Sequence, residues 1–131
     1  MESEFNNLEK MLTIKKAYNK FLTDNKLVPS FVIFAKALEE HDYNSQQELT
    51  AYIACNKAHT SRTLLKMQMA GLIKPIYKKI ALTEKGKQFV EKVNEVNKQF
   101  EEKLFAGISE NDLKTFVKVM NQFSTNIKVF K

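Results

Sequence analysis

The sequence predicts a mainly α-helical fold with a small β-hairpin, in which a winged helix-turn-helix core is flanked by N- and C-terminal dimerisation helices. The chain has three Gly and two Pro in 131 residues, and they fall between or near segments whose apolar residues recur at helical spacing. Two short helical segments are separated by a tight break, and a lysine-bearing hairpin pattern follows them. With 44% hydrophobic residues, the chain is long enough to form one domain, residues 1–131, around a core of its own.

The first two segments are predicted to be amphipathic helices. From Phe5 to Leu22, apolar residues recur every three or four positions, and the helix is expected to end near Lys26. Pro29 suits the first turn of a second helix, because its missing N–H would have had no partner there. This second helix is expected to stop near His41.

The next two segments are predicted to form the helix-turn-helix. Ser45 and Glu48 form a capping box that begins a short third helix. After a three-residue break, Asn56 is placed to cap a fourth helix, Lys57–Ala70, which Gly71 closes. Two short helices joined by so tight a turn are typical of this motif.

The rest of the chain is predicted to be a wing and two further helices. Short apolar runs at 72–73 and 80–82 flank a lysine-rich stretch and indicate a small hairpin. Thr83 is placed to cap a long helix that Gly107 ends, and Ser109 caps a last helix.

The apolar stripe of the last helix continues to Ile127 and Phe130, although chain ends are usually polar. This stripe packs either against the first helix of the same chain or against the ends of a second copy. The second alternative is favoured, because terminal helices beside a compact centre have little else to cover them. The sequence therefore predicts a homodimer.

The positive charge is concentrated in one third of the chain. The net charge is +6, and residues 45–87 carry eight basic residues against Glu48 and Glu84, whereas the remaining residues are balanced. Such a distribution indicates a surface for a polyanion, although a lysine-rich chain also clusters charge by chance. Of the 21 basic residues, Arg62 is the single arginine.

The sequence offers little for catalysis. It contains no glycine-rich phosphate loop and no nucleophile elbow, so we expect no enzyme and no cofactor. Cys55, His41 and His59 supply too few ligands for a structural zinc site, and no metal is expected. The single cysteine and the lack of a leader or of a long apolar run predict a cytoplasmic protein with no membrane contact.

One face of the fourth helix is polar and cationic. We expect its outward residues to be His59, Arg62, Thr63 and Lys66. We expect Leu64, Met67 and Thr60 to turn inward. Such a helix can enter a major groove, with its N-terminal residues at base edges and its flanks at phosphates. An ordinary basic surface helix is the alternative.

The run Leu49–Ile73 resembles, without a gap, the helix-turn-helix of MarR-family transcriptional regulators, and the run Leu82–Gly86 resembles that family's segment after the wing. The resemblance implies a homodimeric winged-helix repressor or activator that binds double-stranded DNA, with a DNA-binding region at 29–87 and dimerisation helices at 1–28 and 88–131. By position it places DNA contacts at Lys57, Ala58, His59, Ser61 and Arg62. With the cap and the flanking lysines, the candidate DNA contacts are Asn56, Lys57, Ala58, His59, Ser61, Arg62, Lys66, Lys74, Lys78 and Lys79.

Two further features bear on this resemblance. The wing is shorter than is usual in the family and has no arginine, so we expect it to contact phosphates rather than to read the minor groove. The family also implies a cavity for a small-molecule effector, which could be lined by Tyr18, Phe21, Phe31, Phe34 and Phe100, although an aromatic cluster is more often plain core. Cys55 is either a redox switch or, as its place in the turn favours, inert packing.

The sequence thus predicts a dimeric DNA-binding transcriptional repressor that places Lys57–Ala70 in the major groove of an inverted-repeat operator. The alternative is a winged-helix module that binds proteins and has lost sequence-specific DNA binding.

Overall fold

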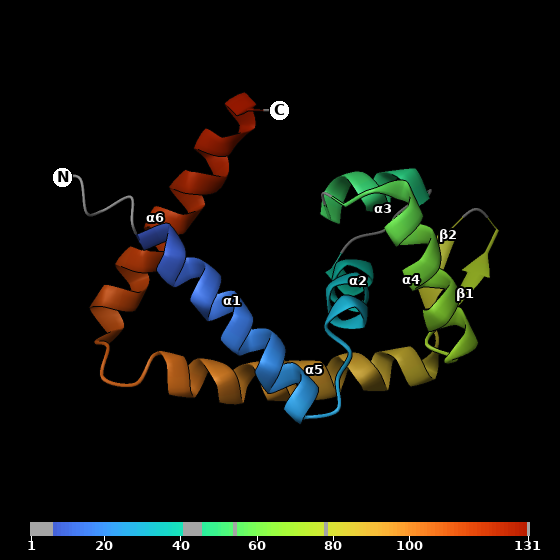
Figure 1. Cartoon of the computed structure of the whole chain (residues 1–131), viewed down its shortest axis with the longest axis horizontal. Helices are drawn as coiled ribbons and strands as arrows, with labels where there is room; N and C mark the ends of the chain where they lie inside the picture. Colours follow the sequence, from blue (N-terminus) through green and yellow to red (C-terminus); the bar gives the residue numbers. More distant parts are fainter. Residues whose placement is uncertain (1–6, 41–45, 54, 78, 131) are drawn as a thin grey trace. The chain divides into compact units, whose positions relative to one another are not determined.

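The computed structural model describes residues 7–40, 46–53, 55–77 and 79–130. Within these ranges, six α-helices, a two-stranded hairpin and a terminal 3₁₀ helix follow one another in the predicted order (Figure 1). The mainly helical fold class with one small hairpin is therefore confirmed. Phe5, His41, Ser45 and Lys78, to which the sequence assigned roles, lie outside the described residues. The chain falls into two compact units, residues 1–98 and 99–131, which are described in turn.

The first two helices, α1 (Asn7–Asp24) and α2 (Pro29–Glu40), are separated by a tight turn. Lys26 has a φ of 63°, and the N–H of Leu27 donates to the carbonyl of Leu22 over 2.9 Å. This is the hydrogen-bond pattern with which a helix ends in a left-handed residue, usually glycine. Leu22 and Leu27 are both buried, so the core contact that accompanies this turn offsets the strain of lysine at a positive φ.

The helix-turn-helix consists of α3 (Gln46–Ile53) and α4 (Lys57–Met69). The Asn56 side chain accepts a hydrogen bond of 2.7 Å from the N–H of His59, which confirms the predicted cap of α4. At the other end, Gly71 has a φ of 79°, and the N–H of Leu72 donates to the carbonyl of Met67 over 3.0 Å. The predicted start of this helix is thus made by the side chain of Asn56, and its predicted end by the positive φ of Gly71.

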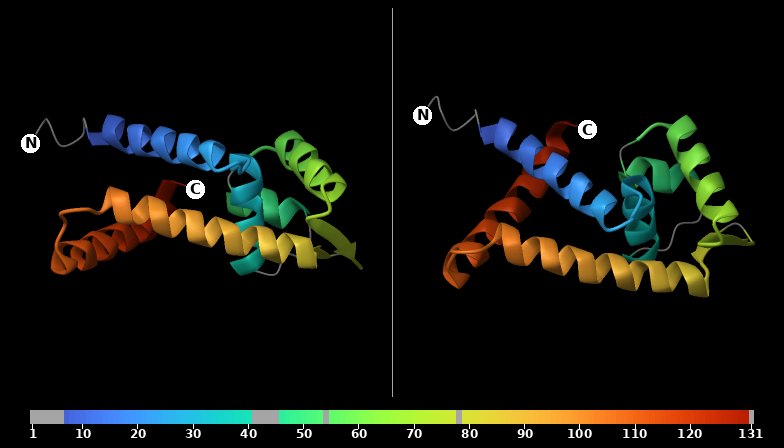
Figure 2. Two further views of the ribbon diagram at one scale, coloured as in Figure 1. Left: turned by 90° about the horizontal axis from the view of Figure 1, so that it is seen from below. Right: turned by 60° about the horizontal axis from the view of Figure 1, so that its bottom comes forward.

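The predicted wing is an antiparallel hairpin of β1 (Ile73–Ile76) and β2 (Lys79–Leu82) (Figures 1 and 2). Ile73 pairs with Leu82, and Ile76 pairs with Lys79 next to the turn. Ile73 is buried, whereas the residues from Lys74 to Tyr77 are exposed. The base of the hairpin therefore belongs to the core and its far end to the surface.

Helix α2 lies between two clusters of buried side chains. The first joins α2 to the helix-turn-helix and includes Phe34, Leu49, Leu64, Met67 and Val90. The second joins α2 to α1 and α5 and includes Leu22, Leu27, Val32, Val93 and Val96. Because both clusters draw on α2, the α3–α4 pair is held on a packed base rather than on a flexible arm.

The second unit begins within α5 (Glu84–Leu104) and contains α6 (Glu110–Asn126) and the 3₁₀ helix η2 (Ile127–Phe130). The Ser109 hydroxyl accepts from the N–H of Asp112 over 3.1 Å, so the predicted cap is confirmed. Gly107 has a φ of 81°, consistent with its predicted role at the end of α5. The α-helix does not reach the C-terminus as predicted, because residues 127–130 tighten into the 3₁₀ form that is common at helix ends.

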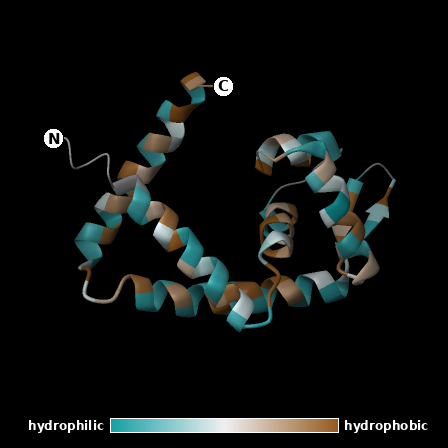
Figure 3. Ribbon diagram, viewed as in Figure 1, coloured by the Kyte–Doolittle hydropathy of each residue, from teal (hydrophilic) through white to brown (hydrophobic). Residues whose placement is uncertain are grey.

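Helix α6 is amphipathic, with polar and apolar residues alternating along it (Figure 3). None of its residues is buried, all of α6 being described. Its exposed apolar side chains include Phe116, Val117 and Phe123. Apolar residues on α1, among them Leu12, are also exposed.

Candidate nucleic-acid interface

A hydrogen-bond network around Thr60 fixes the turn between α3 and α4. The Thr60 hydroxyl, which is fully buried, donates to the carbonyl of Asn56 over 3.2 Å and accepts from the hydroxyl of Thr50 over 2.8 Å. The sulfur of Cys55 lies 3.1 Å from the same oxygen. A satisfied buried polar network of this kind specifies one geometry, because each misplaced partner leaves a buried polar group unpaired. Sequence reasoning expected Thr60 to turn inward but missed that it organises the turn.

Of the four residues predicted to point outward from α4, Arg62 and Lys66 are exposed. Lys57, Ala58, Ser61, Arg62 and Lys66 are exposed, and Leu64 and Met67 are buried.

Thr63 corrects the prediction for this face. It was placed with the cationic residues, but it is 4% exposed. Thr63 lies three residues after Thr60 and four before Met67, so at 3.6 residues per turn it shares their inward face.

His59 lies at the edge of the exposed face. Its side chain is half-buried, and its ring centroid is 6.0 Å from that of Phe34, with the ring planes tilted by 55°. This is a tilted ring contact with the core. Packing against Phe34 therefore holds one side of the His59 ring, and the exposed part of the ring can contact a partner.

Ser61 is engaged by the neighbouring helix. The Gln46 side chain donates to the Ser61 hydroxyl over 2.6 Å. Beside this contact lies a surface hollow of about 460 Å³, lined by Gln46, Gln47, Thr50, Ala51 and Lys57. The surface where α3 meets the start of α4 thus presents amide and hydroxyl groups next to an ammonium group, a set that can hydrogen-bond both bases and phosphates.

The C-terminal end of α4 is tied to the start of α5. Thr83 donates its N–H to the Leu72 carbonyl over 3.0 Å, and its hydroxyl accepts from the N–H of Gly86 over 3.0 Å. Lys85 donates from Nζ to the Ala70 carbonyl over 2.9 Å, so its charge stabilises the end of α4. A Cβ on Gly86 would lie 2.0 Å from the Leu72 carbonyl oxygen, so only glycine fits there. These contacts explain why Thr83, Lys85 and Gly86 occur in the run Leu82–Gly86.

The hairpin carries the remaining candidate cations. Lys74 and Lys79 are exposed, and no ion pair of either is present within the described part of the chain. Tyr77, which sequence reasoning did not single out, is fully exposed and has a φ of 55°. Its combination of exposure with a positive φ became visible only in the structure.

The aromatic residues proposed for an effector cavity separate into different surroundings. Phe31 and Phe34 pack in the first cluster, and Tyr18 and Phe21 pack against the second. Phe100 belongs to the second unit. Tyr18 donates its hydroxyl to the Asn97 side chain and also lines a hollow of about 420 Å³ with residues of α2 and α3, among them Ile33 and Tyr52. The cavity itself stays a prediction.

Lys20, outside this surface, has a shifted pKa. A hydrogen bond to Asp24, reinforced by its charge, raises the pKa of exposed Lys20 above its ordinary value. Among the described residues, no three His, Cys, Asp or Glu side chains gather as metal ligands would. Nor does any helix within those ranges have the length and apolar character to cross a bilayer.

Solved structures share this fold. A MarR family protein from Bacillus stearothermophilus superposes with a TM-score of 0.76 at 22% identity, covering 98% of each chain. A Mycobacterium tuberculosis MarR family protein in complex with DNA has a TM-score of 0.76 at 16% identity, with 88% of this chain and 93% of that one covered. A Bordetella bronchiseptica protein, whose DNA binding is regulated by 6-hydroxynicotinic acid, has a TM-score of 0.70 at 16% identity, with 89% and 92% covered. No protein-family model and no curated protein matches the sequence.

Proposed function

Because the chain has the winged helix-turn-helix fold of MarR-family structures, we propose that it is a dimeric DNA-binding transcriptional repressor. In this proposal α4 enters the major groove of an inverted-repeat operator. The observation that carries it is the set of exposed cations on α4: Lys57 in its first turn, and Arg62 and Lys66 together on one face. Other residues of the same helix, among them Leu64 and Met67, are anchored in the core. The solved relative in complex with DNA supports the same assignment.

The proposed contacts fall into two groups. Ala58, His59, Ser61 and Arg62 lie near the N-terminus of α4, which is the part of a recognition helix that reaches base edges. The cap Asn56 and the lysines at 57, 66, 74, 78 and 79 are proposed to position the protein on phosphates. This division predicts that the lysines set affinity and that Arg62 and its neighbours set sequence choice.

The dimer is proposed from the uncovered apolar surface. Phe116 and Phe123 on α6 are each about half exposed, at 52% and 49%, and apolar residues of η2 continue the stripe. A second copy is the simplest partner that supplies matching apolar surface. Two recognition helices related by a two-fold axis would then meet half-sites about 10 bp apart.

Regulation by a small molecule is a further part of the proposal. It is supported by the relative whose DNA binding responds to 6-hydroxynicotinic acid and by the hollow that Tyr18 lines.

A protein-binding module is the second candidate. Leu65 and Met69 on α4 are exposed, and an apolar pair on a recognition helix favours a protein surface over phosphates. The charge balance favours DNA, since the net excess of +6 resides in residues 45–87.

The deciding experiment is duplex binding by the full chain as a function of salt. Lysine contacts to phosphates predict a log–log slope of about −0.9 for each phosphate neutralised. Substituting Lys74 and Lys79 by alanine is expected to weaken binding to all sequences alike and to make the slope shallower. Lys118→Ala, an exposed lysine of α6, serves as the matched control. A flat salt response would refute DNA binding and leave the protein-binding alternative.

A further inference from the structure

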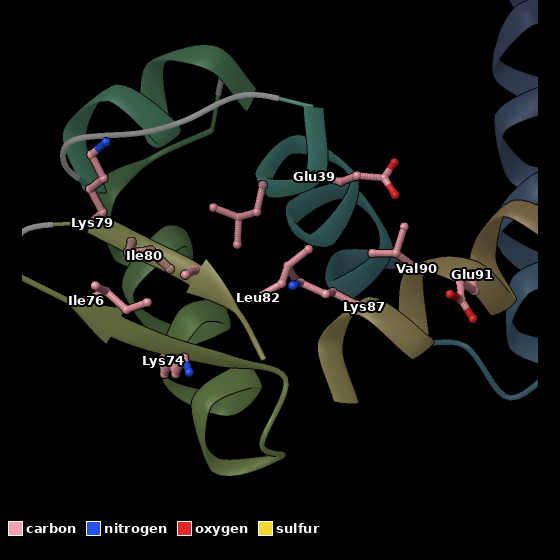
Figure 4. Close-up of a pocket in the computed structure, with 11 residues that line it drawn as sticks. Glu39, Lys74, Ile76, Lys79, Ile80, Leu82, Lys87, Val90 and Glu91 are labelled. Carbon is pink, nitrogen blue, oxygen red and sulfur yellow. The ribbon is translucent and has the colours of Figure 1, made fainter. Parts of the chain in front are cut away.

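We infer that a pocket beside the hairpin binds a small amphipathic anion, a molecule with an apolar body and one carboxylate or similar group. The pocket lies between the hairpin, the last turns of α2 and the first turns of α5, and has a volume of about 630 Å³ (Figure 4). Pockets that hold small organic ligands span about 300–1,000 Å³. Its described lining shares no residue with the hollow that Tyr18 lines.

The floor of the pocket is apolar and firmly held. Leu38, Ile80 and Leu82 are half-buried and pack against the first core cluster, to which buried Val90 belongs. Ile76, which is 42% exposed, adds an apolar wall from β1. An apolar ligand body placed here would remove these side chains from water, which is favourable in proportion to the area covered.

The rim of the pocket is predominantly cationic. Lys74 and Lys79 contribute from the hairpin and Lys87 from α5, and all three are exposed. Two carboxylates also line it, but Glu39 is paired with Lys36 Nζ at 3.0 Å, which leaves Glu91 as the acidic group to set against three ammonium groups. The balance therefore favours an anion over a cation or a neutral molecule.

The arrangement also orients the ligand. In Figure 4, Lys74 and Lys79 lie on the hairpin side of the pocket, whereas Glu39 and Glu91 lie on the helix side, with Leu82 and Val90 between them. The anionic group is thus expected at the hairpin and the apolar body over Leu82 and Val90. A charge-assisted hydrogen bond from lysine would fix that end.

One consequence rests on the proposed function. Lys74 and Lys79 are also the proposed phosphate contacts of the hairpin, so a bound anion would compete with DNA for the same charges. Ligand binding itself does not depend on this, and the two can be tested separately.

The probe is decanoate, titrated into the full chain and followed through its isoleucine methyl groups by NMR. The chain has eight isoleucines. Ile76 and Ile80 line the pocket, whereas Ile14 and Ile108 lie elsewhere and are exposed at 42% and 46%, close to the 42% of Ile76. We expect saturable shifts at Ile76 and Ile80, none at Ile14 and Ile108, and none with decyltrimethylammonium. Equal shifts at all exposed isoleucines, or equal binding of the cation, would overturn the inference.

Matched variants test the rim and the floor. Lys87→Glu is expected to weaken decanoate binding by about tenfold, because it replaces one of the three rim ammonium groups with a carboxylate that repels the anion. Lys92→Glu, which makes the same change at an exposed position of α5 outside the described lining, should have no effect. Ile76→Gln should also weaken binding, and because Ile76 is exposed this change does not disturb the core. Unchanged binding by Lys87→Glu and Ile76→Gln would refute the site.

Two further arms separate the sources of the anion and the two proposals. Free decanoate below its micelle concentration represents a soluble ligand, and phosphatidylglycerol vesicles represent a membrane; a response to vesicles alone would overturn the inference. Where the chain binds duplex DNA, decanoate should weaken that binding in the parent and less in Lys87→Glu. Absence of DNA binding together with decanoate binding would refute the proposed function and leave the pocket standing.

Discussion

Helix α4 buries one of its faces in the core, whereas no residue of helix α6 is buried. In α4 two threonines are buried, Thr60 at 0% and Thr63 at 4% exposure, and Thr60 is satisfied by hydrogen bonds. In α6, Phe116, Phe123 and the apolar residues around them remain exposed. The more apolar stripe is therefore the less covered one. A periodic pattern therefore identifies the face that needs a neighbour, whereas the available neighbours decide what is buried.

The largest expected effect tests the covered side of this comparison. Phe34, which is 1% exposed, packs at the centre of the first cluster and against the His59 ring. Phe34→Ala should lower the free energy of unfolding by about 3–5 kcal/mol, because it leaves a cavity beneath α4. Urea denaturation followed by circular dichroism measures this loss. A loss below 1 kcal/mol would show that the helix-turn-helix does not depend on this core.

A second prediction concerns two glycines: Gly86, which packs beside the end of α4, and Gly107, which lies just before α6. Gly86→Ala would place a Cβ 2.0 Å from the backbone oxygen of Leu72, and forcing the two apart should cost about 3 kcal/mol. Gly107→Ala, at a φ of 81° with nothing within 4 Å, should cost only about 1 kcal/mol of backbone strain. The same denaturation experiment compares them, and equal losses would contradict the close approach of α5 to the end of α4.

The uncovered side is tested by Phe123→Asp. If a second copy covers α6, a carboxylate at this position should weaken dimerisation by about 2–3 kcal/mol, roughly a hundredfold in the dissociation constant. Sedimentation equilibrium of the parent and the variant measures it. Ser124→Asp, the same carboxylate on a neighbouring exposed residue outside the apolar stripe, is the control. A parent that is monomeric at micromolar concentration would refute the dimer.

The smallest expected effect separates sequence reading from charge on α4. Arg62→Lys keeps the charge but removes the planar pair of donors, and should cost about 1–3 kcal/mol on the preferred duplex. Binding to unrelated duplexes should hardly change. Competition binding against duplexes varied at single positions is the measurement. Unaltered affinity and selectivity would make Arg62 one more phosphate contact.

Much of the fold follows from short-range signals. Asn56 and Ser109 cap their helices through bonds to residues three positions away, and Gly71 and Gly107 adopt the positive φ that helix ends require. The register of apolar residues on α4 likewise placed Leu64 and Met67 in the core. These features depend on neighbours within one or two helical turns, so the sequence alone predicts them. The candidate contacts at Arg62 and Lys66 belong to the same class, because residues four apart on a helix share a face.

Other features depend on residues far apart in the chain and are set by contacts between helices and strands. The approach of α5 to Leu72 leaves no room for a side chain at Gly86, and Phe34 draws His59 partly out of the solvent. Thr63 is buried because Thr60 and Met67 face the core that α2 provides, and the anion pocket exists because β1, β2, α2 and α5 meet. Contacts of this kind depend on packing between elements rather than on local propensity, so periodicity cannot specify them.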